Sequence, residues 1–147
     1  MRVQRMWVFA IIFWVGFIFF SSTSLARIES ENAFAFFSGA LFGPAPDQTT
    51  QHQVLHLLAD KGFHVTMFCI LALLLFKAIP ERSHNRWIIL LAGAVVGSCS
   101  ELLQRLFPDR DPALTDVFIN ICGTALGIAL WTALQKWQRR THPLASI

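Results

Sequence analysis

The sequence predicts an all-α integral membrane protein, a four-helix bundle formed by a single domain over residues 1–147. Of its residues, 54% are hydrophobic and only 14% are charged. Because small domains bury only a modest fraction of their surface, a soluble fold of this length could not cover so much apolar area. Four apolar segments also approach the roughly 20 residues needed to cross a hydrocarbon core about 30 Å thick. We expect membrane-spanning helices at about residues 6–25, 57–79, 87–106 and 113–134.

The first apolar segment begins after Arg2 and Arg5 and contains no polar residue up to Phe20. Extended to Leu25, it has about 20 residues, which suffice for a crossing at about 1.5 Å per residue. The alternative is a cleaved signal peptide, since Ser24-Leu25-Ala26 is a small-x-small sequence behind a basic start. The run is longer and more aromatic than the apolar h-region of most signal peptides, so we favour a membrane helix.

A long connection, residues 27–53, follows the first segment. Asn32 is suited to cap a short aromatic helix over residues 33–42, which Gly43-Pro44 would end. About ten residues cannot span the hydrocarbon core. We therefore expect a short interfacial or re-entrant helix in this first outer loop.

Proline and tryptophan mark the limits of the other three segments. The second segment ends at Pro80, and the third starts at Trp87, a residue typical of the membrane interface, and stops at Pro108. Asp111-Pro112 then favours the start of a helix, with aspartate as the cap and proline at the first helical position.

The distribution of basic residues predicts the orientation in the membrane. With the N-terminus inside, the inner side holds Arg2, Arg5, Lys77, Arg82, Arg86, Lys136, Arg139 and Arg140. The outer side then holds Arg27, Lys61, Arg105 and Arg110. This bias predicts that both termini are cytoplasmic.

Several classes of partner and cofactor are disfavoured. The basic residues flank apolar segments and form no stripe with exposed aromatics, so we expect no nucleic-acid partner. Cys69, Cys99 and Cys122 all fall within apolar segments and give neither a disulfide nor a zinc framework. We expect no cofactor.

Polar residues recur at helical spacing in the last two segments. One face of the third segment carries Gly93, Gly97, Glu101 and Gln104. One face of the fourth carries Asp116, Asn120, Gly123 and Gly127. The small-xxx-small pairs let helix backbones approach closely, so we expect the two glycine pairs to meet deep in the bilayer.

The second segment contributes Asp60, Lys61 and His64 at the same depth. Charged groups within a membrane segment cost roughly 2.5–3.5 kcal/mol each on insertion scales, so they usually mark a packed or functional interior. We therefore expect three helices to direct their polar groups toward one region beneath the outer surface.

The ordered set Asp60-Lys61-x-x-His64, Glu101-x-x-Gln104, Arg110 and Asp116-x-x-x-Asn120-x-x-Gly123-x-x-x-Gly127 resembles the signature of the VanZ-like family. The resemblance covers nearly the whole chain, except for the long aromatic loop at residues 27–53. The family is named for a protein associated with low-level teicoplanin resistance, and its members are small bacterial membrane proteins. The resemblance implies a multi-pass protein of the bacterial cytoplasmic (inner) membrane with a role in the cell envelope, including antibiotic resistance, but it implies no particular reaction.

A metal site is a weaker interpretation. His52, His56, Asp60 and His64 recur every four residues, a spacing that brings neighbouring zinc ligands together on a helix. Successive steps of four drift around the helix, however, and the two earlier histidines lie outside the family-like pattern. We therefore expect no metal.

Three functions remain open. The first is binding of an amphiphilic envelope molecule, such as a lipid-linked glycan precursor, a phospholipid or a lipoglycopeptide, whose polar head would meet Lys61, Arg110 and Glu101. The second is a small intramembrane enzyme that uses Glu101 and His64 as acid–base groups on such a lipid. The third is a structural accessory subunit, in which Glu101 is satisfied by Lys61, Arg110 or Gln104 and the network only locks the helices together. The sequence is also compatible with a homo-oligomer or a membrane-protein partner.

Overall fold

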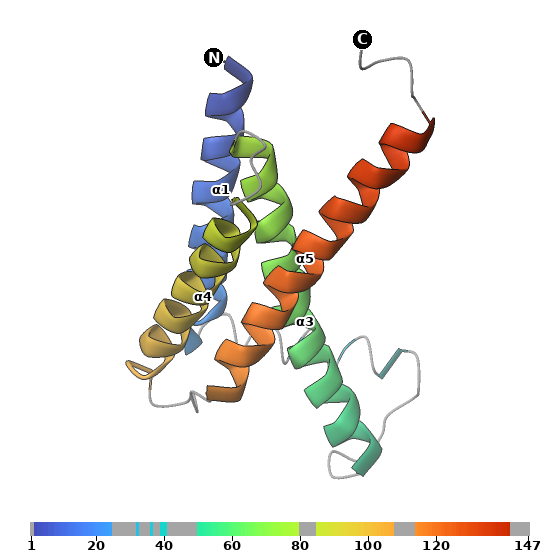
Figure 1. The fold of residues 1–147 in the computed structure, drawn as a ribbon. Coiled ribbons are helices and arrows are strands. Elements are labelled where there is room, and N and C mark those ends of the chain that lie inside the picture. The colour runs from blue at the N-terminus through green and yellow to red at the C-terminus, as the bar shows by residue number, and fades with distance from the viewer. Residues whose placement is uncertain are drawn as a thin grey trace.

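The computed structural model describes residues 2–24, 32, 36, 39–40, 50–79, 85–107 and 114–141. Four long helices dominate the described chain: α1 (Arg2–Ser21), α3 (Thr50–Ala78), α4 (Asn85–Gln104) and α5 (Leu114–Thr141) (Figure 1). Each is long and apolar enough to cross a membrane. Within the described ranges the chain has no strand, so the predicted all-α bundle of four spans is confirmed. The short helix predicted over residues 33–42 falls largely outside those ranges.

The helices differ from the predicted spans mainly at their ends. With 29 and 28 residues, α3 and α5 are longer than a crossing requires. The structure extends α3 back to Thr50, and α5 continues to Thr141 through a basic last turn. Positive side chains are favourable at a helix C-terminus, so Arg139 and Arg140 stabilise the end of α5.

Two serine hydroxyls bond to the backbone at the end of α1. The Ser21 and Ser22 hydroxyls both donate to the carbonyl oxygen of Ile18, at 2.7 and 3.1 Å. These bonds satisfy an acceptor in the last turn, where backbone carbonyls lose their intrahelical partners. The regular helix ends at Ser21, before the predicted limit at residue 25.

The four helices run alternately up and down (Figure 1). The most extensive contact is between α3 and α5; α4 packs mainly on α5, and α1 mainly on α3. The start of α1 and the end of α5 lie at one end of the bundle, here called the termini end, whereas the start of α5 and the end of α4 lie at the other, the loop end. The start of α1 and the end of α5 are thus on the same side, as an even number of spans requires.

The bundle has a small apolar core and a large apolar exterior. Ile18, Met67, Phe68 and Leu71 form the core between α1 and α3. The indole nitrogen of Trp14 joins these helices by donating to the carbonyl oxygen of Met67 at 2.9 Å. On the outer face of α1, by contrast, side chains such as Phe9 and Phe13 are more than two thirds exposed. An apolar exterior of this kind suits contact with lipid.

Side chains of α5 fill the space beside the glycines of α4. A Cβ atom at Gly93 would overlap the hydroxyl of Thr124, and one at Gly97 would lie 3.0 Å from the Cβ of Asn120. Both glycines are buried. They therefore create the space into which α5 inserts two polar side chains.

The glycines of α5 serve a different neighbour. A Cβ at Gly123 would lie 2.6 Å from the carbonyl oxygen of Val65, and one at Gly127 would lie 2.6 Å from that of Cys69. The prediction that the two glycine pairs meet each other is therefore wrong, because Gly123 and Gly127 contact the backbone of α3.

The reason is the width of the polar stripe on α5. At about 100° per residue, Asn120 and Gly123 are separated by about 60° around the helix axis. One edge of the stripe therefore packs on α4, while the other edge packs on α3.

Candidate functional site

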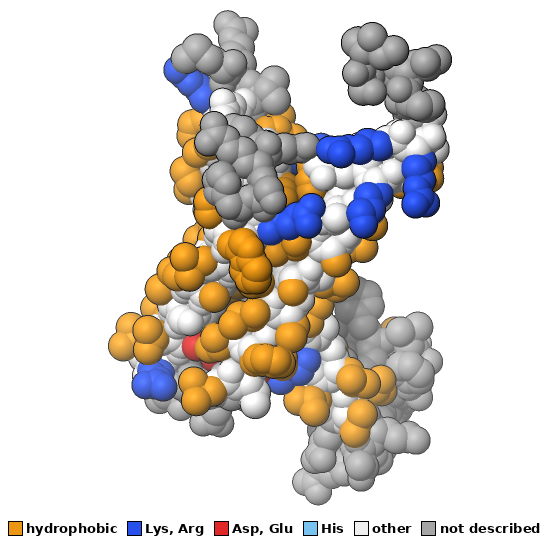
Figure 2. Space-filling view, in the orientation of Figure 1, with side chains coloured by type: hydrophobic (Ala, Val, Ile, Leu, Met, Phe, Trp, Pro, Cys, Tyr) orange, Lys and Arg blue, Asp and Glu red, His pale blue; other side chains and the backbone are white. Residues whose placement is uncertain are grey.

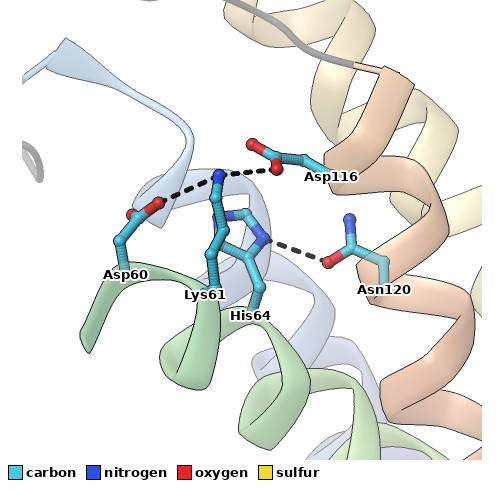
Figure 3. A network of polar contacts seen from close by, with 5 residues as sticks. All are labelled: Asp60, Lys61, His64, Asp116 and Asn120. Carbon is cyan, nitrogen blue, oxygen red and sulfur yellow. Dashed lines mark hydrogen bonds and ion pairs between the residues drawn. The ribbon is translucent and has the colours of Figure 1, made fainter. Parts of the chain in front are cut away.

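An ion-pair network links α3 to α5 near the loop end of the bundle (Figure 3). The ammonium group of Lys61 donates to Asp116 Oδ1 at 2.6 Å and lies 3.2 Å from Asp60 Oδ2. The carboxylate of Asp116 sits in the first turn of α5, where the helix dipole favours negative charge. The single cation thus bridges two carboxylates, one from its own helix and one from α5.

A second polar contact lies one helical turn from the first. Nδ1 of His64 is 3.0 Å from Oδ1 of Asn120 (Figure 3). With the amide oxygen facing the imidazole, Nδ1 donates the hydrogen bond, because a carbonyl oxygen only accepts. His64 follows Asp60 by four residues, and Asn120 follows Asp116 by four. Helical spacing therefore stacks the two contacts along the α3–α5 interface.

Asn120 is also the link between this interface and α4. Its side chain is fully buried, and its amide nitrogen has no hydrogen-bond partner among the described residues. The same nitrogen would lie 3.2 Å from a Cβ at Gly97. The α4 glycine thus leaves room for an amide that donates to nothing described, an arrangement that costs free energy unless a further acceptor is supplied.

The third helix contributes two further predicted residues. Glu101 and Gln104 are both buried on α4, and Glu101 lies one turn beyond Gly97 on the same face. Because Gly97 packs on Asn120, this face is directed toward α5 and away from lipid. A carboxyl group within a span is expected to avoid the acyl chains, and Glu101 does so.

Seven of the eight predicted polar residues therefore lie within the described chain, and together they are called the polar site: Asp60, Lys61, His64, Glu101, Gln104, Asp116 and Asn120. The eighth, Arg110, lies outside the described residues. The structure pairs Lys61 with Asp60 and Asp116, and His64 with Asn120.

The polar site is not equally accessible throughout. The side chains of Asp60 and Lys61 keep 40% and 30% of their exposed area, whereas that of Asp116 keeps 10%. Together the site contains three carboxyl groups and one lysine. It thus presents an acidic, partly open edge on α3 and a buried interior between α3, α4 and α5.

Two buried hydroxyl residues of this region were not among the predicted ones. Thr124 is fully buried, donates to the backbone carbonyl of Asn120 at 2.9 Å and fills the space at Gly93. Ser100 is buried beside Glu101. Thr124 follows Asn120 by four residues, so helical spacing could have identified it. Hydroxyls that bond to the backbone of their own helix are nevertheless common in membrane spans, so a threonine at this spacing does not by itself indicate a functional residue.

No group of three His, Cys, Asp or Glu side chains in the described part of the chain is arranged to hold a metal ion. The polar site is instead built from ion pairs and hydrogen bonds between helices. Such an arrangement can offer hydrogen-bond acceptors, one shared cation and an imidazole to a polar group that approaches from the exposed edge.

Comparison with known proteins adds one match. The model of the VanZ/LLP1 family matches residues 7–135. This range extends from the first turns of α1 into the last turns of α5, and it includes every residue of the polar site. No curated protein sequence and no solved structure matches the chain.

Proposed function

The chain belongs to the VanZ/LLP1 family, as its motifs predicted, and we propose that this multi-pass membrane protein binds an amphiphilic molecule of the bacterial cell envelope through the polar site. The observation that carries the proposal is the partly exposed edge formed by Asp60 and Lys61 above a buried polar interior. Exposed ion pairs contribute little to stability, so helix packing alone does not account for the exposed part of this network.

The chemistry of the edge favours certain polar heads. The three carboxyl groups of the polar site outnumber its single ammonium group, and a carboxylate accepts hydrogen bonds from hydroxyl or amine donors. The sugar of a lipid-linked glycan precursor and the polar part of a lipoglycopeptide carry such donors. A phosphate would have to share Lys61 with Asp60 and Asp116. We therefore rank a head rich in hydroxyl or amine donors, such as a glycan or glycopeptide, above a lipid head dominated by its phosphate.

The position of the site suits an amphiphile. Asp116 lies in the first turn of α5, so the polar site is near one end of the spanning segments. A polar head bound there would remain close to the membrane surface, while its chains lie along the exposed apolar faces of the helices. Binding would place both parts of one molecule in the surroundings that they prefer.

The distribution of charge supports an outward-facing site. Among the described side chains, the termini end carries Arg5, Lys77, Arg86, Lys136, Arg139 and Arg140. Figure 2 shows lysine and arginine side chains gathered where α5 ends. The described basic residues toward the loop end are Lys61 and Arg105. By the positive-inside rule, the termini lie in the cytoplasm and the polar site faces the outside of the bacterial inner membrane.

The test is analysis of co-purified lipid. Wild-type protein, Lys61→Gln and the control Arg105→Gln are purified in mild detergent, and bound amphiphiles are extracted and identified by mass spectrometry. We expect a glycan-bearing or glycopeptide-like lipid with the wild type and the control, and its loss from Lys61→Gln. Arg105 lies near the same end of the bundle and is exposed, so it controls for lost positive charge.

Two outcomes point elsewhere. Folded Lys61→Gln protein that retains the same amphiphile would contradict binding at the polar site. Loss of helical content and of monodisperse elution in Lys61→Gln, with no amphiphile in the wild type, would favour a structural subunit. Turnover of the identified lipid by purified protein would add catalysis, with Glu101 and His64 as the first residues to replace.

A further inference from the structure

A groove of about 370 Å³ lies at the termini end of the bundle, between α1, α3 and α5. Its lining consists of Trp7, Ile70, Leu73, Leu74, Lys77, Trp131, Leu134, Gln135 and Gln138. None of these residues belongs to the polar site, which lies toward the other end of the bundle. The groove therefore requires an explanation of its own.

The groove changes from apolar to polar along its length. On α3, Ile70 lies about 10 Å deeper than Lys77, at about 1.5 Å per residue. Between them, Leu73 and Leu74 make the wall apolar. On α5, Gln138 lies a similar distance beyond Trp131. The deep part therefore suits hydrocarbon, and the rim offers an ammonium group and amides.

Aromatic contacts position the cation at the rim. The ring of Trp131 stacks on that of Phe76, with centroids 5.4 Å apart and an interplanar angle of 9°. The ammonium of Lys77 lies 4.9 Å from the centroid of the Trp131 ring. A cation at this distance is attracted by the ring but keeps its charge and its hydrogen-bond donors. Lys77 is thus held beside the groove with donors still available.

We propose that this groove binds one anionic phospholipid from the leaflet that surrounds the termini end. The phosphate accepts hydrogen bonds from Lys77 and from the amide of Gln138, and an acyl chain lies along Leu73 and Leu74. The lining contains one cation and no carboxylate, so its charge complements an anion. Lys136, Arg139 and Arg140 at the same end add a field that attracts anionic lipid.

The same charges argue against a second copy of the chain as the occupant. The described charged side chains at the termini end are all basic. Two copies joined through this end would bring like charges together, which disfavours association. A lipid supplies the opposite charge and a chain that fits the apolar wall.

The test is a lipid titration of the full-length protein by native mass spectrometry in detergent, with phosphatidylglycerol as the anionic probe and phosphatidylethanolamine as the zwitterionic one. We expect the wild type to bind phosphatidylglycerol several times more tightly. Lys77→Gln should weaken phosphatidylglycerol binding about fivefold, the effect of removing one lysine beside an anionic lipid. Lys77→Arg should keep the preference, because it retains the positive charge.

Two exposed positions on α5 sharpen the test. Lys136→Gln removes an equal charge from the same end of the bundle, but Lys136 does not line the groove, so it should change phosphatidylglycerol affinity by less than twofold. Gln138→Glu places a carboxylate at the rim and should weaken phosphatidylglycerol binding without affecting folding. It reports on the groove even if Lys77→Gln fails to fold.

The proposal is overturned if the wild type binds the two lipids equally. It is also overturned if Lys136→Gln weakens binding as much as Lys77→Gln, because the charge would then act as a diffuse field and not at the groove. Unchanged affinity in Gln138→Glu leads to the same conclusion. None of these variants alters the polar site, so the results are independent of the function proposed for it.

Discussion

Replacement of Gly123 by alanine tests the close approach of α3 and α5. A Cβ at this position would lie 2.6 Å from the carbonyl oxygen of Val65 and 2.9 Å from its Cα. Both atoms belong to the backbone of α3, so no side chain can rotate away. An ordinary contact starts at 3.4 Å, and the difference from 2.6 Å is 0.8 Å. Relief of the overlap along this contact therefore requires the helices to separate locally by about that amount.

The separation would act directly on the polar site, because Val65 follows His64 in the chain. The contact between His64 and Asn120 measures 3.0 Å, and a further 0.8 Å would take it beyond hydrogen-bond range. Overpacking typically costs about 1–3 kcal/mol. The lost hydrogen bond and the better helix propensity of alanine act in opposite directions, each by about 1 kcal/mol. We expect Gly123→Ala to lower the free energy of unfolding by about 1–3 kcal/mol.

Reversible unfolding in mixed micelles, followed by helical circular dichroism, measures this change. The control is Gly62→Ala, because Gly62 lies in α3 close to the polar site but nothing stands within 4 Å of its added Cβ. There alanine should raise stability by about 0.5–1 kcal/mol through helix propensity. If Gly123→Ala were as stable as Gly62→Ala, the two helices would not approach as closely as described.

Three further predictions concern single contacts and the orientation. His64→Phe should destabilise the protein by about 1–3 kcal/mol, because it removes the hydrogen-bond partner of the buried Asn120 amide oxygen. His64→Gln should cost less, because glutamine can still donate a hydrogen bond. An equal effect of the two substitutions in unfolding titrations would argue against this hydrogen bond. Trp14→Phe should lower the free energy of unfolding by about 1 kcal/mol, because it removes the hydrogen bond from the indole to the backbone of α3. The same unfolding assay measures this change. An unchanged stability would show that water replaces the indole as the donor. In a variant without native cysteines, a cysteine that replaces Arg105 should react with an impermeant thiol reagent from outside the cell. A cysteine that replaces Lys136 should react only after permeabilisation. The reverse pattern would show that the protein has the opposite orientation in the membrane.

The sequence predicted the helices and the helix faces that carry the polar residues, because both follow from hydropathy and spacing along one chain. Apolar runs of about 20 residues identify spans, and steps of three or four residues identify a shared face. Asp116 and Asn120 were accordingly placed on one face of α5, with Gly123 and Gly127 beside them. Buried Glu101 and Gln104 likewise lie on the predicted face of α4.

Spacing within one helix could not assign partners between helices. The stripe on α5 is about 60° wide and its two edges contact different neighbours, and only the rotation and crossing of the helices decide which edge meets which. For that reason the glycines of α5 were assigned to α4, although they pack on Val65 and Cys69 of α3. The groove beside Lys77 was equally invisible, because its lining comes from three helices and includes ordinary leucines.

The most direct test of the interface that builds the polar site is a double-mutant cycle on its shortest polar contact, Lys61 to Asp116. Stabilities of the wild type, Lys61→Gln, Asp116→Asn and the double variant are measured by the same unfolding assay. If these side chains meet between α3 and α5, the two substitutions are coupled by at least about 1 kcal/mol, within the range seen for residues in contact. Effects that add to within about 0.5 kcal/mol, as they do for distant residues, would contradict the account.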